Sequence, residues 1–141
     1  KFQIKKKLKG FMNLFQLKPF KSHSGKALTW KIECDALTDE DWKTLAYVSA
    51  KYLLSKDVTF SSVVPILEGG AKLAKALDAY CYPISDTVLL VDDVMTTGNS
   101  LQNIYSKYKT DDNNVAALVV FNRSGGSIAP WIHPLFDVKA L

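Results

Sequence analysis

The chain has 141 residues, 48% of them hydrophobic and 23% charged, which is the length and composition of a single soluble globular domain. No stretch approaches the roughly 20 apolar residues of a transmembrane helix, and no uninterrupted apolar segment follows the first lysines as in a secretory signal. Cys34 and Cys81 have neither CxxC spacing nor a disulfide framework, so we expect a cytoplasmic protein without a membrane partner.

The net charge of +4 is concentrated at the beginning of the sequence. Residues 1–26 contain eight lysines and no acid, whereas the remainder has ten basic and fourteen acidic residues. A solvated lysine face beside an apolar helix face explains this segment most simply. A surface that attracts a phosphorylated ligand is an alternative, as is contact with nucleic acid or a membrane. The lysines are not interleaved with an exposed aromatic pattern, which argues against a nucleic-acid partner.

The first predicted elements are a strand and a long helix. Leu28, Trp30 and Ile32 alternate as in a half-buried strand. A helix is predicted over residues 38–54, because Thr38 and Asp41 form a near capping box and apolar residues follow at helical spacing.

Strands and helices alternate through the following residues. The pattern predicts, in order, a strand at 59–66, a glycine-containing turn at 67–70, a helix at 71–80, a strand at 88–92, a helix at 101–109 and a strand at 115–121. The tail after Phe121 is predicted to be loop-rich, with a little apolar structure at its end. This alternation indicates parallel βαβ units. We therefore predict an α/β fold with a compact, doubly wound, mostly parallel sheet that binds its ligand at the carboxyl ends of the strands.

The run VLLVDDVMTTGNS, residues 88–100, has the most specific chemistry in the sequence. A strand that is apolar on both sides leads into the adjacent acids Asp92 and Asp93. Small and hydroxyl residues then precede the next helix: Thr96, Thr97, Gly98, Asn99 and Ser100. Hydroxyl and backbone N–H groups at a helix N-terminus can bind a phosphate, and carboxylates accept hydrogen bonds from sugar hydroxyls. A turn that only caps the helix is the alternative.

This run resembles the phosphoribosyl diphosphate (PRPP) signature of the type I phosphoribosyltransferases. The resemblance implies that Asp92 and Asp93 face the ribose hydroxyls as catalytic residues, and that Thr96 to Ser100 enclose the 5-phosphate. It implies Mg2+ as a cofactor bound with PRPP, which the two acids would hold only indirectly, through the ligand or water. It also implies a homodimer and a single domain over residues 1–141, with small hood elements at about 1–37 and 123–141.

Three further segments resemble the family, and the last two of them are similar to orotate phosphoribosyltransferase within it. Leu67, Glu68, Gly69 and Gly70 occupy the place of the diphosphate loop, although a plain tight turn is the alternative. The stretch FKSHSGKALTWKIECD resembles a segment that folds over the base, which implies base contacts by His23 and Lys26. Arg123 in FNRSGG matches an arginine that meets the carboxylate of the base. A solvent-exposed loop histidine and a surface or helix-capping arginine are the alternatives at His23 and Arg123.

The sequence departs from the family in three places, each of which removes positive charge. Glu68 stands where the orotate enzymes carry a lysine, and His23 replaces another lysine. Only residues 81–87 separate a predicted helix from the next strand, where the family has an additional strand and a long basic mobile loop. A parallel neighbour needs a crossover of about a dozen residues, so we expect the sheet to be smaller at that edge.

Two functions remain open from the sequence. The first is a phosphoribosyltransferase-like protein that binds PRPP or a nucleotide monophosphate and transfers a phosphoribosyl group to orotate or a related base. The second is a catalytically impaired module of the same fold that binds PRPP or a nucleotide, with a regulatory role. The missing loop bears on the choice between these two functions, because a basic lid would neutralise the leaving diphosphate and exclude water during transfer.

Overall fold

The computed structural model describes residues 15–16, 20–21, 27–28 and 31–138 of the chain, with side chains from Glu33 onward. The chain divides into two compact units, residues 1–38 with 141, and residues 39–140. The first unit contains β1 (Phe15–Gln16) paired with β4 (Lys31–Ile32), β2 (Phe20–Lys21) paired with β3 (Ala27–Leu28), and the 3-10 helix η1 (Cys34–Ala36). Both pairs are antiparallel. The single strand predicted through Leu28 and Ile32 is therefore replaced by two short strands.

The second unit is built around a four-stranded sheet in which every neighbouring pair is parallel. Its strands lie in the order of the sequence: β5 (Ser62–Pro65), β6 (Thr87–Met95), β7 (Asn114–Asn122) and β8 (Ile132–Asp137). The two central strands are buried over nearly their whole apolar runs, as expected of strands covered on both faces. The predicted α/β fold with a parallel sheet is thus confirmed.

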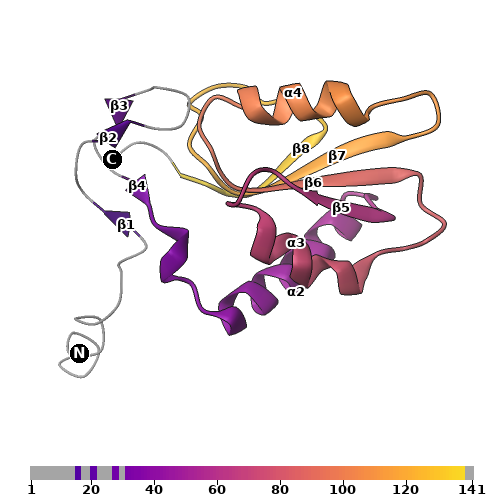
Figure 1. The fold of residues 1–141 in the computed structure, drawn as a ribbon, viewed down its shortest axis with the longest axis horizontal. Coiled ribbons are helices and arrows are strands. Elements are labelled where there is room, and N and C mark those ends of the chain that lie inside the picture. The colour runs from indigo at the N-terminus through magenta and orange to yellow at the C-terminus, as the bar shows by residue number, and fades with distance from the viewer. Residues whose placement is uncertain (1–14, 17–19, 22–26, 29–30, 139–141) are drawn as a thin grey trace. The chain divides into compact units, whose positions relative to one another are not determined.

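Helices cover both faces of this sheet. Helices α2 (Asp39–Ser55) and α3 (Ala71–Leu77) lie together on one face, and α4 (Asn99–Tyr108) lies on the other (Figure 1). The core under α4 contains Val88 and Leu90 of β6 packed with Leu101, whereas the alternate residues Leu89 and Val91 are fully buried as well. Among the described residues, no helix combines the length and apolar character needed to span a membrane.

The two helical connections of the sheet differ in hand. Each moves one strand in the same direction, from β5 to β6 through α3 and from β6 to β7 through α4. Because α3 and α4 cover opposite faces (Figure 1), the two crossovers must have opposite hands. Crossovers between parallel strands are right-handed in about 98% of cases. One connection of this small sheet is therefore of the rare left-handed kind.

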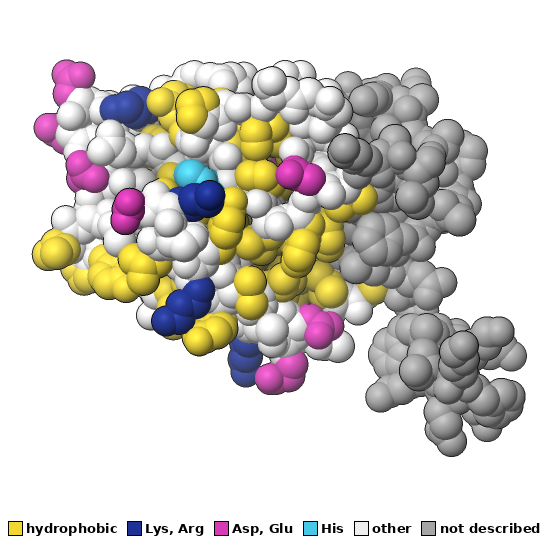
Figure 2. All heavy atoms as spheres, turned by 180° about the vertical axis from the view of Figure 1, so that it is seen from behind, with side chains coloured by type: hydrophobic (Ala, Val, Ile, Leu, Met, Phe, Trp, Pro, Cys, Tyr) yellow, Lys and Arg dark blue, Asp and Glu magenta, His cyan; other side chains and the backbone are white. Residues whose placement is uncertain are grey.

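Strand β8 departs from the sequence prediction. The tail was expected to be loop-rich and to contribute to a hood, but Ile132–Asp137 pairs with β7 as the last strand of the sheet. Pro134 weakens the strand signal, yet it is tolerated because β8 is an edge strand with one unpaired side. His133 of β8 is the only histidine of the described residues, so it is the side chain coloured cyan in Figure 2, and it is half-buried. Burial and the charge of Lys56 lower the pKa of His133.

Candidate functional site

The two adjacent acids lie where β6 extends beyond its neighbour β5. Pairing between these strands ends at Pro65 and Val91, whereas β6 continues to pair with β7 as far as Met95. Asp92 and Asp93 therefore lie inside a longer β6 than the predicted strand, yet on the β5 side they come after the last paired residue. Each carboxylate accepts the N–H of the next residue, at 2.8 Å from Asp93 N to Asp92 Oδ1 and 2.7 Å from Val94 N to Asp93 Oδ1. These local bonds fix both carboxylates against the backbone of the strand.

The environment of Asp92 disfavours the ionised form of its carboxyl group. Burial first, and then a hydrogen bond to Asp93 and the negative charge of Asp93, together raise the pKa of Asp92 to about 8. Burial and a neighbouring acid both disfavour the ionised form of a carboxyl group, so Asp92 keeps its proton near neutral pH. A protonated carboxyl can donate a hydrogen bond and an ionised one can accept it. The pair is therefore equipped to contact a hydroxyl-rich ligand in both senses.

The glycine loop after β5 lies directly against the acid pair. Built on the backbone of Gly69, a Cβ atom would be 2.5 Å from Asp93 Oδ1 and 2.8 Å from its Cγ, so any side chain at this position would displace the Asp93 carboxylate. A Cβ on Gly70 would overlap the carbonyl oxygen of Val91, which already accepts a hydrogen bond of 2.8 Å from Ile66 N. Gly70 is thus required by its close approach to the backbone of β6, whereas Gly69 leaves the Asp93 carboxylate in its observed position.

The rest of this loop faces outward. Leu67 is 71% exposed and has a φ of +51°, a left-handed conformation that is uncommon for a bulky side chain. Glu68 is also exposed, and its carbonyl accepts the N–H of Ala71. The loop therefore presents an apolar and an acidic side chain to solvent.

The loop between β6 and α4 forms the N-terminus of a regular helix. Gly98 adopts a left-handed φ of +79° and its carbonyl accepts the N–H of Gln102 at 2.9 Å, which starts the helix. Thr97 Oγ1 accepts the N–H of Asn99 at 3.4 Å. The first turn of a ten-residue helix points its remaining amides and its partial positive charge toward this loop. The residues predicted for a phosphate thus lie at a helix end suited to an anion.

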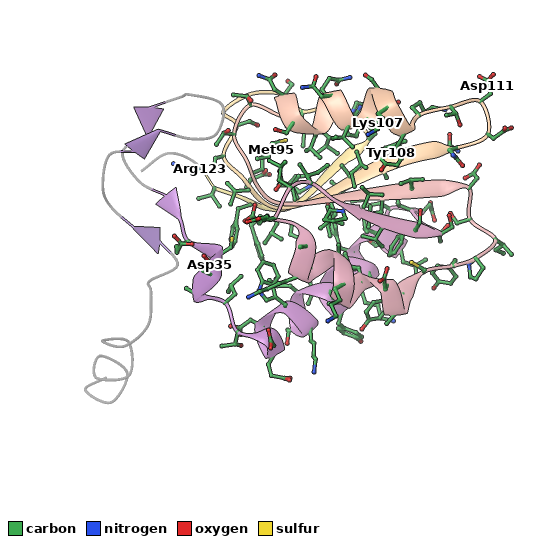
Figure 3. The ribbon with its side chains drawn as sticks, in the orientation of Figure 1. Asp35, Met95, Lys107, Tyr108, Asp111 and Arg123 are labelled. Atoms are coloured by element: carbon green, nitrogen blue, oxygen red, sulfur yellow. The ribbon has the colours of Figure 1, made fainter. Side chains whose placement is uncertain are left out.

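Arg123 joins the same edge of the sheet through its backbone. Its N–H donates to the carbonyl of Met95 at 2.8 Å, which ties the end of β7 to the end of β6. Figure 3 shows Arg123 and Met95 near one end of the sheet, opposite the end that carries Asp111. The guanidinium is partly buried, and burial lowers its pKa. The predicted base-binding residues His23 and Lys26 lie outside the described residues.

A second polar cluster at this edge was not predicted from the sequence. The buried Asn122 donates from Nδ2 to Asp137 Oδ1 at 2.9 Å and accepts from the N–H and hydroxyl of Ser124 at 3.0 and 2.8 Å. These bonds hold the start of the FNRSGG segment and the end of β8 together. The asparagine directly before Arg123 was visible in the sequence, but its partner lies fifteen residues away on a strand that was not predicted.

The donor set around the acids fits indirect rather than direct metal binding. Within the part of the chain that the structure describes, no three histidine, cysteine, aspartate or glutamate side chains cluster as a metal site. Two adjacent carboxylates suit Mg2+, which takes oxygen ligands and usually keeps several waters or substrate phosphates in its shell. Asp92 and Asp93 could therefore hold Mg2+ together with a phosphorylated ligand.

The segment after α3 matches the expected reduction of the sheet. Residues 78–80 form the 3-10 turn η2, and the described residues 81–86 contain no strand. Instead, Tyr82 N donates to Phe60 O at 2.8 Å and Ser85 Oγ accepts from Thr59 Oγ1 at 3.2 Å. The segment thus returns along the start of β5 directly to β6. It leaves β5 as an edge strand of the sheet.

Comparison with known proteins identifies the fold. No family model and no curated protein matches the sequence. Among solved structures, orotate phosphoribosyltransferase from Aeropyrum pernix is similar with a TM-score of 0.61 and 22% identity, over 78% of this chain and 76% of that chain. The xanthine-guanine-hypoxanthine phosphoribosyltransferase of Helicobacter pylori aligns with a TM-score of 0.56 and 15% identity, over 74% and 84% of the two chains.

A third similar structure is not described as a transferase. It is a hypothetical protein from Neisseria gonorrhoeae with bound ppGpp, similar with a TM-score of 0.57 and 15% identity over 73% of this chain and 82% of that chain. Identities this low establish the architecture and not the activity. The parallel sheet and its covering helices therefore have the fold of the type I phosphoribosyltransferases.

Proposed function

We propose that this protein binds a ribose 5-phosphate compound, PRPP or a nucleotide monophosphate, and transfers the phosphoribosyl group to orotate or a related base. The observation that carries the proposal is the contact between Asp93 and Gly69 beside the N-terminus of α4. It brings three features of the sequence to one edge of the sheet: an acid pair, a glycine loop and a hydroxyl-rich helix start. Ligands of open α/β sheets bind at this edge.

Each group has a distinct role in the proposed reaction. The hydroxyls and amides of Thr96 to Ser100 would hold the 5-phosphate, and Asp92 and Asp93 would hold the ribose hydroxyls. During transfer, the bond from C1 to the diphosphate oxygen breaks, the bond from C1 to a ring nitrogen forms, and that nitrogen loses its proton. The carboxylates stabilise the positive charge that develops on the ribose ring. Arg123 would contact an acidic base.

Mg2+ would supply positive charge next to the leaving diphosphate. Asp92 and Asp93 are the residues that would hold it, through water or the ligand. The loop Leu67 to Gly70 would offer backbone N–H groups to the diphosphate. We further propose a cytoplasmic homodimer, in which a neighbouring chain could contribute cations to the site.

The decisive experiment follows diphosphate release. The protein is incubated at high concentration with PRPP, Mg2+ and orotate, and with uracil, hypoxanthine or guanine in place of orotate. Base-dependent release of diphosphate supports transfer and identifies the acceptor. Absence of turnover with every base refutes the transferase proposal.

The alternative is a nucleotide-binding or regulatory module that does not catalyse transfer. The exposed Glu68 in the diphosphate loop and the missing basic lid favour it, as does the structurally similar protein with bound ppGpp. Calorimetry distinguishes it from an enzyme: a nucleotide or PRPP binds, binding depends on Thr96 and Thr97, and no base exchange occurs.

A further inference from the structure

The part of the proposed site that would face a diphosphate, formed by the glycine loop after β5 and the acids of β6, contains several acidic side chains and few cations. Between Lys75 and Lys107 the sequence has no lysine or arginine, but it has Asp78, Asp86, Asp92 and Asp93. Residues 57–71, which include β5 and the glycine loop, likewise have no basic side chain. The nearest cation along the chain is Lys72, an exposed residue in the first turn of α3. The glycine loop itself therefore offers an anion only its backbone N–H groups.

Geometry adds to this imbalance of charge. The Asp93 carboxylate occupies the space against Gly69 that a Cβ would fill, so one side of the loop is already covered by an anionic group. Glu68, the residue before Gly69, is exposed and adds a second carboxylate to the same loop. A second anion placed at Leu67 to Gly70 would lie close to both carboxylates, and like charges repel, more strongly at the partly buried Asp93 than at the exposed Glu68. The helix start at Gly98 does not have an acid in its own loop, Thr96 to Ser100.

We infer that the site selects ribose 5-phosphate compounds whose C1 substituent is not an anion, so that a nucleoside 5′-monophosphate binds in preference to free PRPP, with Glu68 as the specificity-determining residue. This inference rests on the proposed function, because it assumes that Thr96 to Ser100 hold the 5-phosphate. The monophosphate uses only the helix start, whereas PRPP must also place its diphosphate beside Glu68 and Asp93. Mg2+ reduces the preference, since it neutralises part of the diphosphate charge.

The test measures affinities of the full chain for three probes by calorimetry: ribose 5-phosphate, uridine 5′-monophosphate and PRPP. Each is titrated first in EDTA and then in Mg2+. In EDTA we expect the two monophosphates to bind at least about tenfold more tightly than PRPP. In Mg2+ we expect this difference in affinity to be smaller. Glu68→Lys should strengthen PRPP binding about tenfold while changing ribose 5-phosphate binding less than about threefold. Asp111→Lys is the matched control, because it adds the same charge in an exposed loop at the other end of the sheet (Figure 3).

The outcomes separate this inference from the function on which it rests. If none of the three probes binds, the proposed function itself fails. If ribose 5-phosphate binds and PRPP binds at least as tightly in EDTA, the proposed function stands and the selectivity inference is overturned. Equal effects of Glu68→Lys and Asp111→Lys on PRPP overturn the assignment to Glu68, because net charge alone then explains the change. Circular dichroism of each variant verifies that it is folded.

Discussion

The loops that follow β5 and β6 differ in charge, in backbone conformation and in the length of the helix that comes after each. The loop after β6 leads through Gly98 into a regular ten-residue helix and contains hydroxyl groups and no charge. The loop after β5 contains the left-handed Leu67 and the exposed Glu68, and it leads into a helix of seven residues. The first loop is suited to holding an anion and the second is poor in the cations that would help an anion leave. The two loops therefore differ in how well each could hold an anion.

The connections of the sheet also differ between the β5 side and the β7 side. A further strand outside β5, as in the family that the sequence resembles, would reverse the direction of the step made after α3. Both crossovers would then have the same hand even though α3 and α4 cover opposite faces. Without that strand, the chain passes from η2 through residues 81–86 directly to β6 and the two crossovers differ in hand. The edge at which the sheet is smaller is thus the β5 edge, whose loop we propose contacts the diphosphate.

The largest effect on stability is expected where the loop after β5 contacts β6. Gly70→Ala places a Cβ on the carbonyl oxygen of Val91, and backbone on both sides prevents an easy shift. We expect a loss of about 3 kcal/mol or more in the free energy of unfolding, measured by urea denaturation. Gly126→Ala is the control, because nothing lies within 4 Å of its Cβ position, and it should change stability by less than about 0.5 kcal/mol. Similar midpoints for the two variants contradict the described packing.

The buried acid Asp92 gives the next largest effect on stability, and the size of this effect depends on pH. The pKa of Asp92 is raised to about 8 in the folded chain, above its ordinary value of 3.8. Between these values the folded state holds a proton that the unfolded state has released, so stability falls as pH rises, by about 1.4 kcal/mol per unit at most. Asp92→Asn keeps an acceptor for the Asp93 N–H and removes this dependence.

We therefore expect Asp92→Asn to stabilise the protein at pH 8 by a few kcal/mol, with a much smaller change near pH 4. Urea denaturation across this pH range measures the effect. Asp111→Asn serves as a control on an exposed carboxyl at the opposite end of the sheet. A parallel pH dependence of stability in the wild type and Asp92→Asn would refute the raised pKa.

The difference between the two loops also explains what the sequence could predict. The strand before Asp92 and the helix after the loop at 96–100 follow from local patterns, namely an apolar run and small residues before a helix, although α4 begins at Asn99 and not at the predicted Leu101. Strand β8 was missed because Pro134 disfavours a strand, and only its position at the sheet edge makes the proline acceptable. The contact of Asp93 with Gly69 joins residues on different elements, so the sequence indicated that the two loops would be neighbours but could not give their spacing.

The phosphate loop provides a smaller, ligand-specific test. Thr97→Ala removes the hydroxyl that accepts the Asn99 N–H and that we propose contacts the 5-phosphate. We expect ribose 5-phosphate to bind about tenfold more weakly, by calorimetry, with little change in stability. Thr110→Ala is matched, since Thr110 Oγ1 also accepts a backbone N–H, from Asn113 at 3.1 Å, in an exposed loop outside the proposed site. Equal affinities of the two variants contradict the proposed phosphate site.

The smallest expected effect concerns the two non-glycine residues of the described chain that have left-handed backbone, Leu67 at φ +51° and Asp57 at φ +58°. A bulky side chain pays about 1–2 kcal/mol in this conformation, whereas aspartate tolerates it, and glycine costs about 0.5–1 kcal/mol through the entropy of the unfolded chain. Because Leu67 is 71% exposed, Leu67→Gly loses little burial and should stabilise the protein by about 0.5 kcal/mol. Asp57→Gly should be neutral or slightly destabilising in the same urea titration. If Leu67→Gly instead destabilises the protein more than Asp57→Gly, the leucine makes a contact that offsets its strain, and the loop after β5 is better ordered than its conformation indicates.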